Sequence, residues 1–447
     1  MLPIKGVAAI NRRAFDSLVA WSKSRKRKPL LIRGARQVGK TWLMKEFGRS
    51  FYEKTAYINF DNNERMKNLF QGDFEEQRII TALQIETKTK IVAENTLLIF
   101  DEIQEAPQAI SALKYFFEEA PHYQILAAGS LLGVAMHQEA SFPVGKVDFL
   151  DLYPLDFIEF IEASGHDELT GLIREQDYAL LNTFSDKYID LLRQYFYLGG
   201  MPEVVADYLS EHDFRSAREI QKRILKGYEY DFSKHISQDY VPRVRMLWNS
   251  IPTQLAKENR KFLYRLIKSG ARAREYELAL NWLSDCGLIH QVPRVSKPGM
   301  PLIAYQDQSA FKIYHFDVGL LSAMSNLPVE VLLEGNRVFE EFKGAIAEQY
   351  VLQQLKAAGN IDLYYWAADK GTAEVDFVCQ LNSVIIPLEV KATINLQAKS
   401  LKSYRERFNP VISVRTSLSD FKYDREVIDL PLFAIIKLLD IVHDFLS

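Results

Sequence analysis

The residues with the clearest chemical meaning form one loop, with the spacing G-x-x-x-x-G-K-T: Gly34, Ala35, Arg36, Gln37, Val38, Gly39, Lys40 and Thr41. The loop follows the apolar run 30–32 and precedes a segment that favours a helix, 42–47. Such a turn directs backbone N–H groups into one concavity, which suits phosphate oxygens. Lys40 is expected to reach the β- and γ-phosphates, and the Thr41 hydroxyl to complete a magnesium shell. The loop therefore predicts a site for a nucleoside triphosphate with Mg²⁺.

A second pair of candidate residues, Asp101 and Glu102, ends the apolar run 96–100. A run of this kind is typical of a strand buried on both faces. Asp101 is expected to hold the magnesium, directly or through water, and Glu102 to orient or polarise an attacking water. The alternative is a strand end at the surface with two solvated acids.

A third group lies near the end of the sequence. Asp376 begins one predicted strand, and Glu389 and Lys391 share one side of another, because alternate side chains of a strand point the same way. With Glu348 from a predicted helix, they resemble the D…E-x-K site of restriction-endonuclease-like folds. That resemblance implies that Asp376 and Glu389 bind Mg²⁺ and that Lys391 positions or activates a water. A salt bridge at a sheet edge, in a fold that does not cut, is the alternative.

The elements that position the first two groups alternate between strand and helix. Strands are predicted at 29–33, 55–60, 96–100 and 124–130, with helices between them. This alternation favours a parallel sheet, whose ligands lie beyond the carboxyl ends of the strands. Ser130 falls at that edge, where it would sense the γ-phosphate. An ordinary turn at Ser130 is the alternative.

Five segments together resemble a family of prokaryotic AAA-type ATPases whose C-terminal domain has no known function. They are the glycine-rich loop, the strand LLIFDE, the tip AAGS, and the segments 153–160 (YPLDFIEF) and 198–203 (LGGMPE). The resemblance implies that the cofactors are ATP and Mg²⁺. Relatives of this type generally work as oligomers, so a homo-oligomer is expected. The chain departs from the family at Gly145-Lys146, where a Gly-Arg pair is expected, and lysine lacks the planar fork of an arginine finger.

The segment 243–274 has a different charge from the rest of the chain. Nine cations and one acid, Glu258, give it a local charge of +8; the cations are Arg243, Arg245, Lys257, Arg260, Lys261, Arg265, Lys268, Arg272 and Arg274. The pattern predicts a winged helix-turn-helix with helices at 260–268 and 274–286. A hairpin with its tip at Pro298-Gly299 and Ile303 among its strand residues would follow. Such modules bind double-stranded DNA. Use of the module only for packing or oligomer contacts is the alternative.

Composition limits the remaining choices. A chain of 447 residues predicts two to three domains, and 48% hydrophobic residues indicate an ordered protein. The net charge of −3 gives no global sign of nucleic-acid binding. Two distant cysteines, with neither a secretory h-region nor a membrane-length apolar run, predict a cytoplasmic protein without a membrane partner.

The expected fold class is α/β, in four parts. Residues 1–160 form a P-loop core of AAA type with a parallel sheet, and 161–240 a helical lid or connector. Residues 241–330 form the winged helix, and 331–447 an α/β nuclease-like domain. The tail 430–447 is predicted as an amphipathic helix that packs on the core.

Three functions fit these patterns. The first is an ATPase that acts on DNA, with a C-terminal domain that is a metal-dependent nuclease. The second is a nucleotide-controlled oligomeric switch in signalling or defence, which binds a protein partner and does not cut DNA. The third, a transcription regulator, would use the winged helix but not the carboxylate–lysine group.

Overall fold

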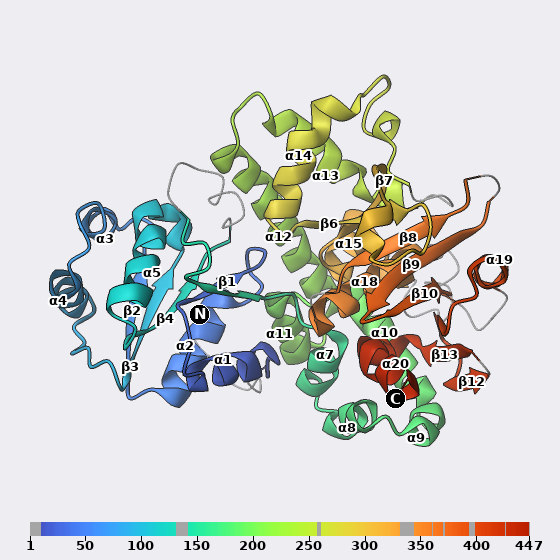
Figure 1. Ribbon diagram of the computed structural model, residues 1–447, viewed down its shortest axis with the longest axis horizontal. Helices are drawn as coiled ribbons and strands as arrows, with labels where there is room; N and C mark the ends of the chain where they lie inside the picture. Colours follow the sequence, from blue (N-terminus) through green and yellow to red (C-terminus); the bar gives the residue numbers. More distant parts are fainter. Residues whose placement is uncertain are drawn as a thin grey trace. The chain divides into compact units, whose positions relative to one another are not determined.

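The computed structural model describes residues 10–130, 142–256, 261–330, 344–359, 361–369, 372–392, 398–424 and 426–446. The chain divides into two compact units. The N-terminal unit consists of residues 11–153 and 285–288, and the C-terminal unit of 154–284 and 289 onward. Figure 1 draws most of the N-terminal unit in blue to cyan and the C-terminal unit in green to red. In the described residues, no helix combines the length and the apolar character needed to cross a membrane.

The N-terminal unit contains a five-stranded parallel sheet with the order β2-β3-β4-β1-β5. Its strands are β1 (Leu30–Arg33), β2 (Lys54–Asn59), β3 (Thr96–Asp101), β4 (Gln124–Ala128) and β5 (Asp148–Asp151). The predicted parallel sheet and its first four strands are confirmed. The fifth strand was not predicted, because its sequence Asp-Phe-Leu-Asp is short and only partly buried.

Helices cover this sheet on both faces. Residues of α3 (Glu64–Leu69), α4 (Glu76–Thr87) and α5 (Pro107–Glu119) share one apolar cluster with alternate residues of the strands. The other helix of interest, α2 (Lys40–Phe51), packs Leu43, Met44 and Phe47 against the sheet, with α1 (Ala14–Lys23) beside it. Because successive strand residues point to opposite faces, strands covered in this way read as continuous apolar runs.

The C-terminal unit begins with helices, and those within 161–240 agree with the helical segment predicted there. The helices are α7 (Phe157–Ala163), α8 (Asp167–Glu175), α9 (Tyr178–Thr183), α10 (Ser185–Leu198), α11 (Pro202–Glu211), α12 (Phe214–His235) and α13 (Val241–Leu255). The segment 198–203 (LGGMPE) contains the turn between α10 and α11. There Gly199 has φ +72°, and a Cβ at Gly199 would lie 2.2 Å from the Asp317 carboxylate. Only glycine therefore fits this turn.

The predicted winged-helix segment contains η2 (Tyr264–Leu266), α14 (Ala273–Asp285), β6 (Ile289–Val295), η3 (Leu302–Tyr305) and β7 (Gln306–His315). The second predicted helix and the β6–β7 hairpin are present. The first predicted helix is wrong in its extent, because the described part of 260–268 contains only the single turn η2. Ile303 is also not a strand residue, since it lies in η3.

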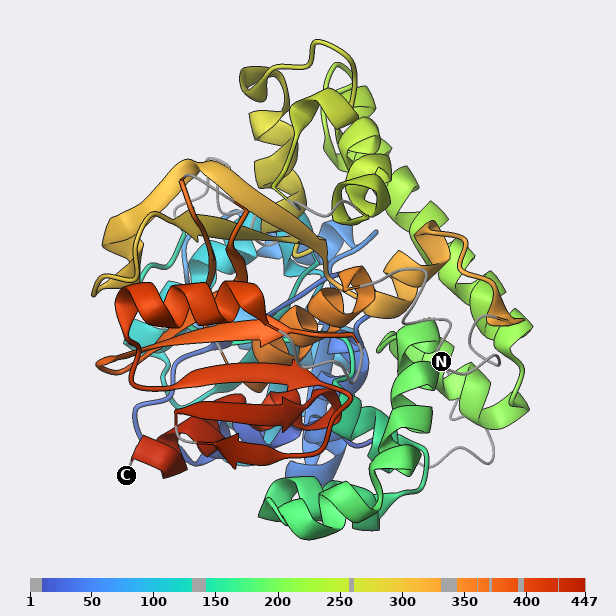
Figure 2. The same cartoon turned by 90° about the vertical axis from the view of Figure 1, so that its right-hand side faces the viewer.

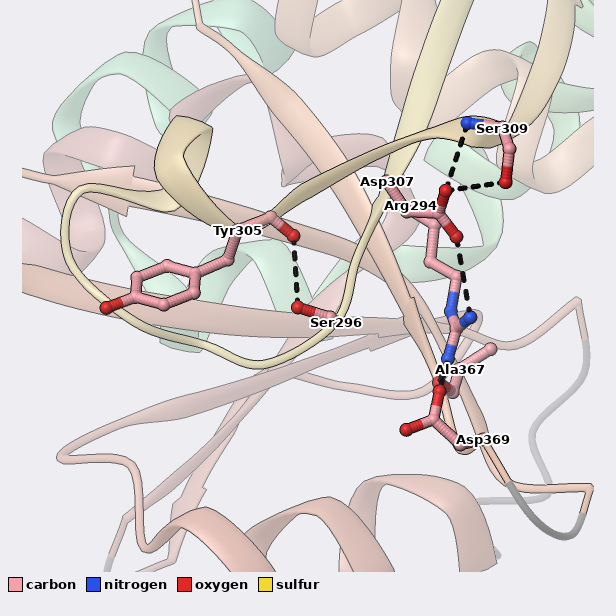
Figure 3. A network of polar contacts seen from close by, with 7 residues as sticks. All are labelled: Arg294, Ser296, Tyr305, Asp307, Ser309, Ala367 and Asp369. Atoms are coloured by element: carbon pink, nitrogen blue, oxygen red, sulfur yellow. Dashed lines mark hydrogen bonds and ion pairs between the residues drawn. The ribbon is translucent and has the colours of Figure 1, made fainter.

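The β6–β7 hairpin belongs to a larger sheet and is not a free wing. Strand β6 pairs in parallel with β8 (Leu363–Ala367), and Figure 3 shows the polar contacts that hold this junction. Arg294 of β6 donates to the carbonyl oxygen of Ala367 (2.7 Å), pairs with Asp369 after β8, and lies 3.6 Å from the carboxylate of Asp307 on β7. One guanidinium thus joins three segments of the sheet.

In the part of the chain that the structure describes, this sheet has eight strands in the order β12-β13-β11-β10-β9-β8-β6-β7. The other strands are β9 (Glu374–Leu381), β10 (Val384–Val390), β11 (Ser413–Ser417), β12 (Lys422–Asp424) and β13 (Val427–Pro431), seen in orange and red in Figure 2. This sheet crosses the predicted boundary at 330, so segments 241–330 and 331–447 share one sheet.

Helices α18 (Ala345–Ala358) and α19 (Lys399–Phe408) pack on the eight-stranded sheet, and α15 (Val318–Met324) packs against α10 and α12. The prediction of one helix over 430–447 is wrong at its start. The chain finishes β13, passes through η4 (Leu432–Lys437) and only then forms α20 (Leu438–Leu446).

Candidate functional site

The glycine-rich loop joins β1 to α2 in the conformation that the motif requires. Gly34, Gln37 and Gly39 all have positive φ, at +147°, +66° and +97°. A Cβ at Gly34 would lie 2.2 Å from the carbonyl oxygen of Leu152, so this position excludes every larger residue. The tight turn presents its backbone N–H groups at the N-terminus of α2, where the helix dipole favours negative charge.

Lys40 is the first residue of α2 and is buried, with 7% of its surface exposed. Its Nζ donates to the carbonyl oxygens of Gly34 and Ala35, each at 2.8 Å. Burial lowers the pKa of Lys40 to about 8, while the nearby Glu102 and Asp101 carboxylates oppose this shift. A polyanion beside Lys40 would favour the charged form further, because opposite charges stabilise each other at low dielectric.

Asp101 is the meeting point of the predicted residues. Its Oδ2 accepts hydrogen bonds from the Thr41 hydroxyl at 2.7 Å and from the Tyr57 hydroxyl at 2.9 Å. Its Oδ1 accepts from the backbone N–H of Glu102 at 3.1 Å. The structure therefore brings Thr41 and Asp101 together, as expected, and adds Tyr57 of β2, which the sequence reasoning missed.

Glu102 and Ser130 also follow their strands at the carboxyl edge of the sheet. Glu102 has φ +51°, and its Oε2 accepts from the side-chain amide of Gln104 at 2.6 Å, another contact that was not predicted. Ser130 is 8% exposed, and within the described residues its hydroxyl oxygen has no hydrogen-bond partner. A buried hydroxyl without a partner is an unusual cost, which a bound acceptor or donor would remove.

Arg12 supports the loop from a distant part of the sequence. It is 5% exposed, and its guanidinium donates to the carbonyl oxygens of Val38 (2.9 Å) and Tyr153 (2.6 Å). No motif marks this arginine, since its partners are backbone atoms far along the chain. Lys146, at the position expected for a finger arginine, pairs with Glu118 of the same chain at 2.8 Å.

The second candidate site lies in the C-terminal unit, on neighbouring antiparallel strands. Leu388 of β10 is opposite Phe377 of β9, which sets Glu389 beside Asp376. Asp376 Oδ2 accepts from the backbone N–H of Val390 at 2.8 Å, and Lys391 Nζ donates to Glu389 Oε1 at 2.7 Å. The structure thus brings together Asp376, Glu389 and Lys391.

Glu389 has the most perturbed carboxyl group of this site. It is 4% exposed, and in the described part of the chain its Oε2 has no hydrogen-bond partner. Burial, and then the neighbouring Asp376 carboxylate, raise the pKa of Glu389 to about 8, although Lys391 opposes the shift. Such a shift means that the pair Asp376 and Glu389, without a bound cation, shares a proton near neutral pH. A bound cation would displace this proton.

Glu348 of α18 takes part in an adjacent ion-pair network. Its Oε2 accepts from the Tyr314 hydroxyl at 2.9 Å and lies 3.8 Å from Nζ of Lys312. Lys312 of β7 is fully buried and pairs with Glu374 at 2.6 Å. Sequence reasoning missed Lys312, although a single lysine between Phe311 and Ile313 in a strand was an available signal.

Within the described residues, no group of three or more histidine, cysteine, aspartate or glutamate side chains is arranged to hold a metal ion. Any metal in the C-terminal site would therefore depend on the pair Asp376 and Glu389 with other oxygen donors.

Most exposed cations of the basic segment lie in the turn before α14 or at the start of that helix, and Arg245 lies on α13. The exposed members are Arg245, Arg265, Lys268, Arg272 and Arg274. Lys257, Glu258 and Arg260 lie outside the described residues. The exposed positions of α14 include Glu275, Glu277 and Asp285, so the positive charge is concentrated at its N-terminal end.

The parallel sheet and the glycine-rich loop of the N-terminal unit are those of a P-loop domain. The comparison with family models agrees: residues 26–161 match the model described as an AAA domain. Residues 189–330 and 343–433 each match a domain of unknown function, DUF8612 and DUF4143 respectively. A search of the curated proteins found no significant match.

Several solved structures are similar to this chain. The Walker-type ATPase PABY2304 of Pyrococcus abyssi has 14% identity and a TM-score of 0.44, over 71% of this chain and 96% of that one. ORC1 of Aeropyrum pernix, solved in complex with DNA, has 12% identity and a TM-score of 0.27, over 72% and 92%. The Holliday junction branch migration motor RuvB of Thermotoga maritima has 13% identity and a TM-score of 0.28, over 63% of this chain and 90% of that one. At these values none of them carries a function to this chain.

Proposed function

We propose that the chain is a magnesium-dependent ATPase that acts on DNA. The observation that supports hydrolysis best is the convergence of Lys40, Thr41, Asp101 and Glu102 at one edge of the sheet. A cation, a hydroxyl and two carboxylates in this order are the groups that phosphoryl transfer to water needs.

The residues present fit magnesium. The Thr41 hydroxyl and the Asp101 carboxylate are hard oxygen donors already 2.7 Å apart, and Mg²⁺ prefers such donors. When bound, the ion would neutralise charge on the phosphates. Lys40 would hold the phosphate oxygens, and it would exchange its bonds to the Gly34 and Ala35 carbonyl oxygens for them.

Glu102 would hold the attacking water, with the Gln104 amide fixing its carboxylate through Oε2. Ser130, after the neighbouring strand β4, would direct its hydroxyl to the γ-phosphate; among the described residues this hydroxyl has no hydrogen-bond partner. The test is Glu102→Gln, which keeps the shape but removes the charge that polarises water. We expect bound ATP to persist with little release of phosphate, and normal turnover in this variant would exclude the role.

We propose the turn before α14 as the DNA contact. Arg265, Lys268 and Arg272 are exposed there, next to the N-terminus of a helix. Exposed cations and a helix N-terminus both favour the binding of phosphate groups. The acidic side chains farther along α14 disfavour a helix that lies along the groove, so the contact would be to the backbone rather than to base edges.

The test compares Arg265→Glu/Lys268→Glu with a control of equal charge, Lys222→Glu/Lys402→Glu, whose lysines are exposed elsewhere on the C-terminal unit. Affinity for double-stranded DNA should fall more in the first variant. The slope of log affinity against log salt concentration should also become shallower, by the equivalent of about two phosphate contacts. Equal effects would remove the DNA contact. If added DNA does not change the rate of ATP hydrolysis, the alternative function is favoured, a nucleotide-controlled switch that binds a protein partner.

A second candidate function is metal-dependent cleavage of DNA at Asp376, Glu389 and Lys391. The buried Oε2 of Glu389, which has no hydrogen-bond partner among the described residues and lies beside a second carboxylate, favours this function. With Glu389 deprotonated, Asp376, Glu389, Glu348 and Glu374 would carry four negative charges against Lys391 and Lys312. A divalent cation that replaces the proton of the Asp376–Glu389 pair would balance this charge. Bound there, Mg²⁺ would lower the pKa of a water. Asp376 and Glu389 would hold the ion, and Lys391 would orient that water.

Cleavage is tested with Asp376→Asn and Lys391→Met, and with Asp424→Asn on the exposed strand β12 as the control. Titration with Mn²⁺ gives a second readout that does not need turnover. Asp376→Asn should lose metal binding and cutting, Lys391→Met should lose cutting only, and the control should retain both. Cutting by both site variants would point to a contaminating nuclease and remove the assignment.

A further inference from the structure

The nucleotide site contains a tyrosine that no motif assigns. Tyr57 lies on β2, two residues before the strand ends at Asn59. Asn59 is opposite Asp101 in the parallel pair β2–β3, and Tyr57 is opposite Ile99. Because alternate residues share a face, Tyr57 and Asp101 lie on the same face, displaced diagonally by two residues. A tyrosine is long enough to span this diagonal, and its hydroxyl donates to Asp101 Oδ2 at 2.9 Å.

The ring of Tyr57 is held from the other side by α2. Nζ of Lys45 lies 3.7 Å from the ring centroid, a cation–π contact. Lys45 is four residues after Thr41, so both side chains are on the same face of the helix. Tyr57 therefore bridges the helix that carries Thr41 and the strand that carries Asp101.

The hydroxyl groups decide which part of Asp101 stays available. A carboxylate oxygen has about two acceptor positions. Oδ2 already accepts from Thr41 and Tyr57, whereas Oδ1 accepts only from the Glu102 N–H among the contacts of the described residues.

We propose that Tyr57 is a positioning residue for magnesium: it fixes Asp101 through Oδ2, keeps Oδ2 shared with Thr41, and leaves Oδ1 to receive a metal-bound water. This inference rests on the nucleotide site proposed above. Without the tyrosine hydroxyl, Asp101 keeps its charge but loses one of the two bonds that orient Oδ2. The affinity for the Mg²⁺–ATP pair should then fall, while affinity for ATP alone, which depends on the loop and Lys40, should not.

The test is Tyr57→Phe in the full chain, with Tyr52→Phe as the matched control. Tyr52 is in the same unit, and its hydroxyl bonds Gln124, which is not a site residue. Binding of a fluorescent ATP analogue is measured in EDTA and then across a Mg²⁺ titration. One lost hydrogen bond predicts a rise of about 3- to 10-fold in the Mg²⁺ concentration at half-effect for Tyr57→Phe. Binding in EDTA should be unchanged, and the control should match the wild type.

Two results would overturn the inference. If Tyr57→Phe has the wild-type Mg²⁺ dependence, or if it only lowers the melting temperature, the tyrosine is a structural brace. If the wild type itself binds no nucleotide, the proposed function fails and the inference fails with it. If the wild type binds ATP and Tyr57→Phe has the same Mg²⁺ concentration at half-effect, the inference is rejected while the proposed nucleotide site stands.

Discussion

Replacing Arg12 by methionine tests whether the glycine-rich loop depends on support from outside the motif. Methionine keeps much of the apolar stem but removes both hydrogen bonds, to the carbonyl oxygens of Val38 and Tyr153. A hydrogen bond from a charged donor contributes roughly 1.5–3 kcal/mol. At the lower end the two bonds amount to about 3 kcal/mol, which is roughly a hundredfold in the equilibrium between closed and open loop.

The assay is hydrogen exchange followed by mass spectrometry, together with binding of an ATP analogue. Peptides that cover the loop and the start of α2 should exchange faster in Arg12→Met. Because the two lost hydrogen bonds amount to about 3 kcal/mol, the dissociation constant for ATP should rise by roughly 10- to 100-fold. Peptides of β3 report whether the sheet stays closed. Arg12→Lys should recover part of the loss, because lysine retains the charge but lacks the fork.

The control is Arg25→Met, at an exposed arginine of the same unit. It should leave both exchange and ATP binding unchanged. Loop exchange in Arg12→Met that equals the wild type would refute the reasoning, since the two buried bonds would then not hold the loop closed.

Three further predictions concern charged groups. Lys40→Ala should abolish ATP binding, because a buried ammonium beside the loop is the main compensation for phosphate charge; retained affinity in an equilibrium binding assay would contradict this. Glu389, with a folded pKa of about 8 against an ordinary 4.5, binds its proton in the folded state where the unfolded chain has lost it. The stability of the C-terminal unit should therefore fall as pH rises from about 4.5 to 8, and Glu389→Gln should flatten this part of the profile in urea unfolding. Lys312→Met should lower the free energy of unfolding by about 3–5 kcal/mol, because it leaves the buried Glu348 and the partly buried Glu374 without their cation. Lys312→Met/Glu374→Gln should recover part of the loss. If Lys312→Met alone has the same free energy of unfolding as the wild type, the ion-pair network of Lys312, Glu348 and Glu374 does not contribute to stability.

The candidate nucleotide site could be read from sequence to an unusual degree, because each of its parts is local. The glycine positions, Lys40 and Thr41 belong to one turn, and Asp101 and Glu102 to one strand end. Local spacing also suggested Asp376, Glu389 and Lys391, since two adjacent strands and a short hairpin carry them.

The supporting residues could not be predicted, because their partners are distant in sequence. Arg12 binds backbone atoms, which leave no trace in residue type. Tyr57 depends on the register of β2 against β3. Lys312 depends on the pairing of the β6–β7 hairpin with β8, which brings this segment into the sheet that carries the acidic residues.

The sequence by itself determined the alternation of buried strands and helices, the phosphate-binding turn and the acidic strand ends, because hydrophobic periodicity and glycine chemistry act over a few residues. Only the tertiary structure decided which side chains support those groups. It also decided that a hairpin predicted as a wing is part of an eight-stranded sheet, because strand pairing depends on long-range register and on how well buried charges find partners.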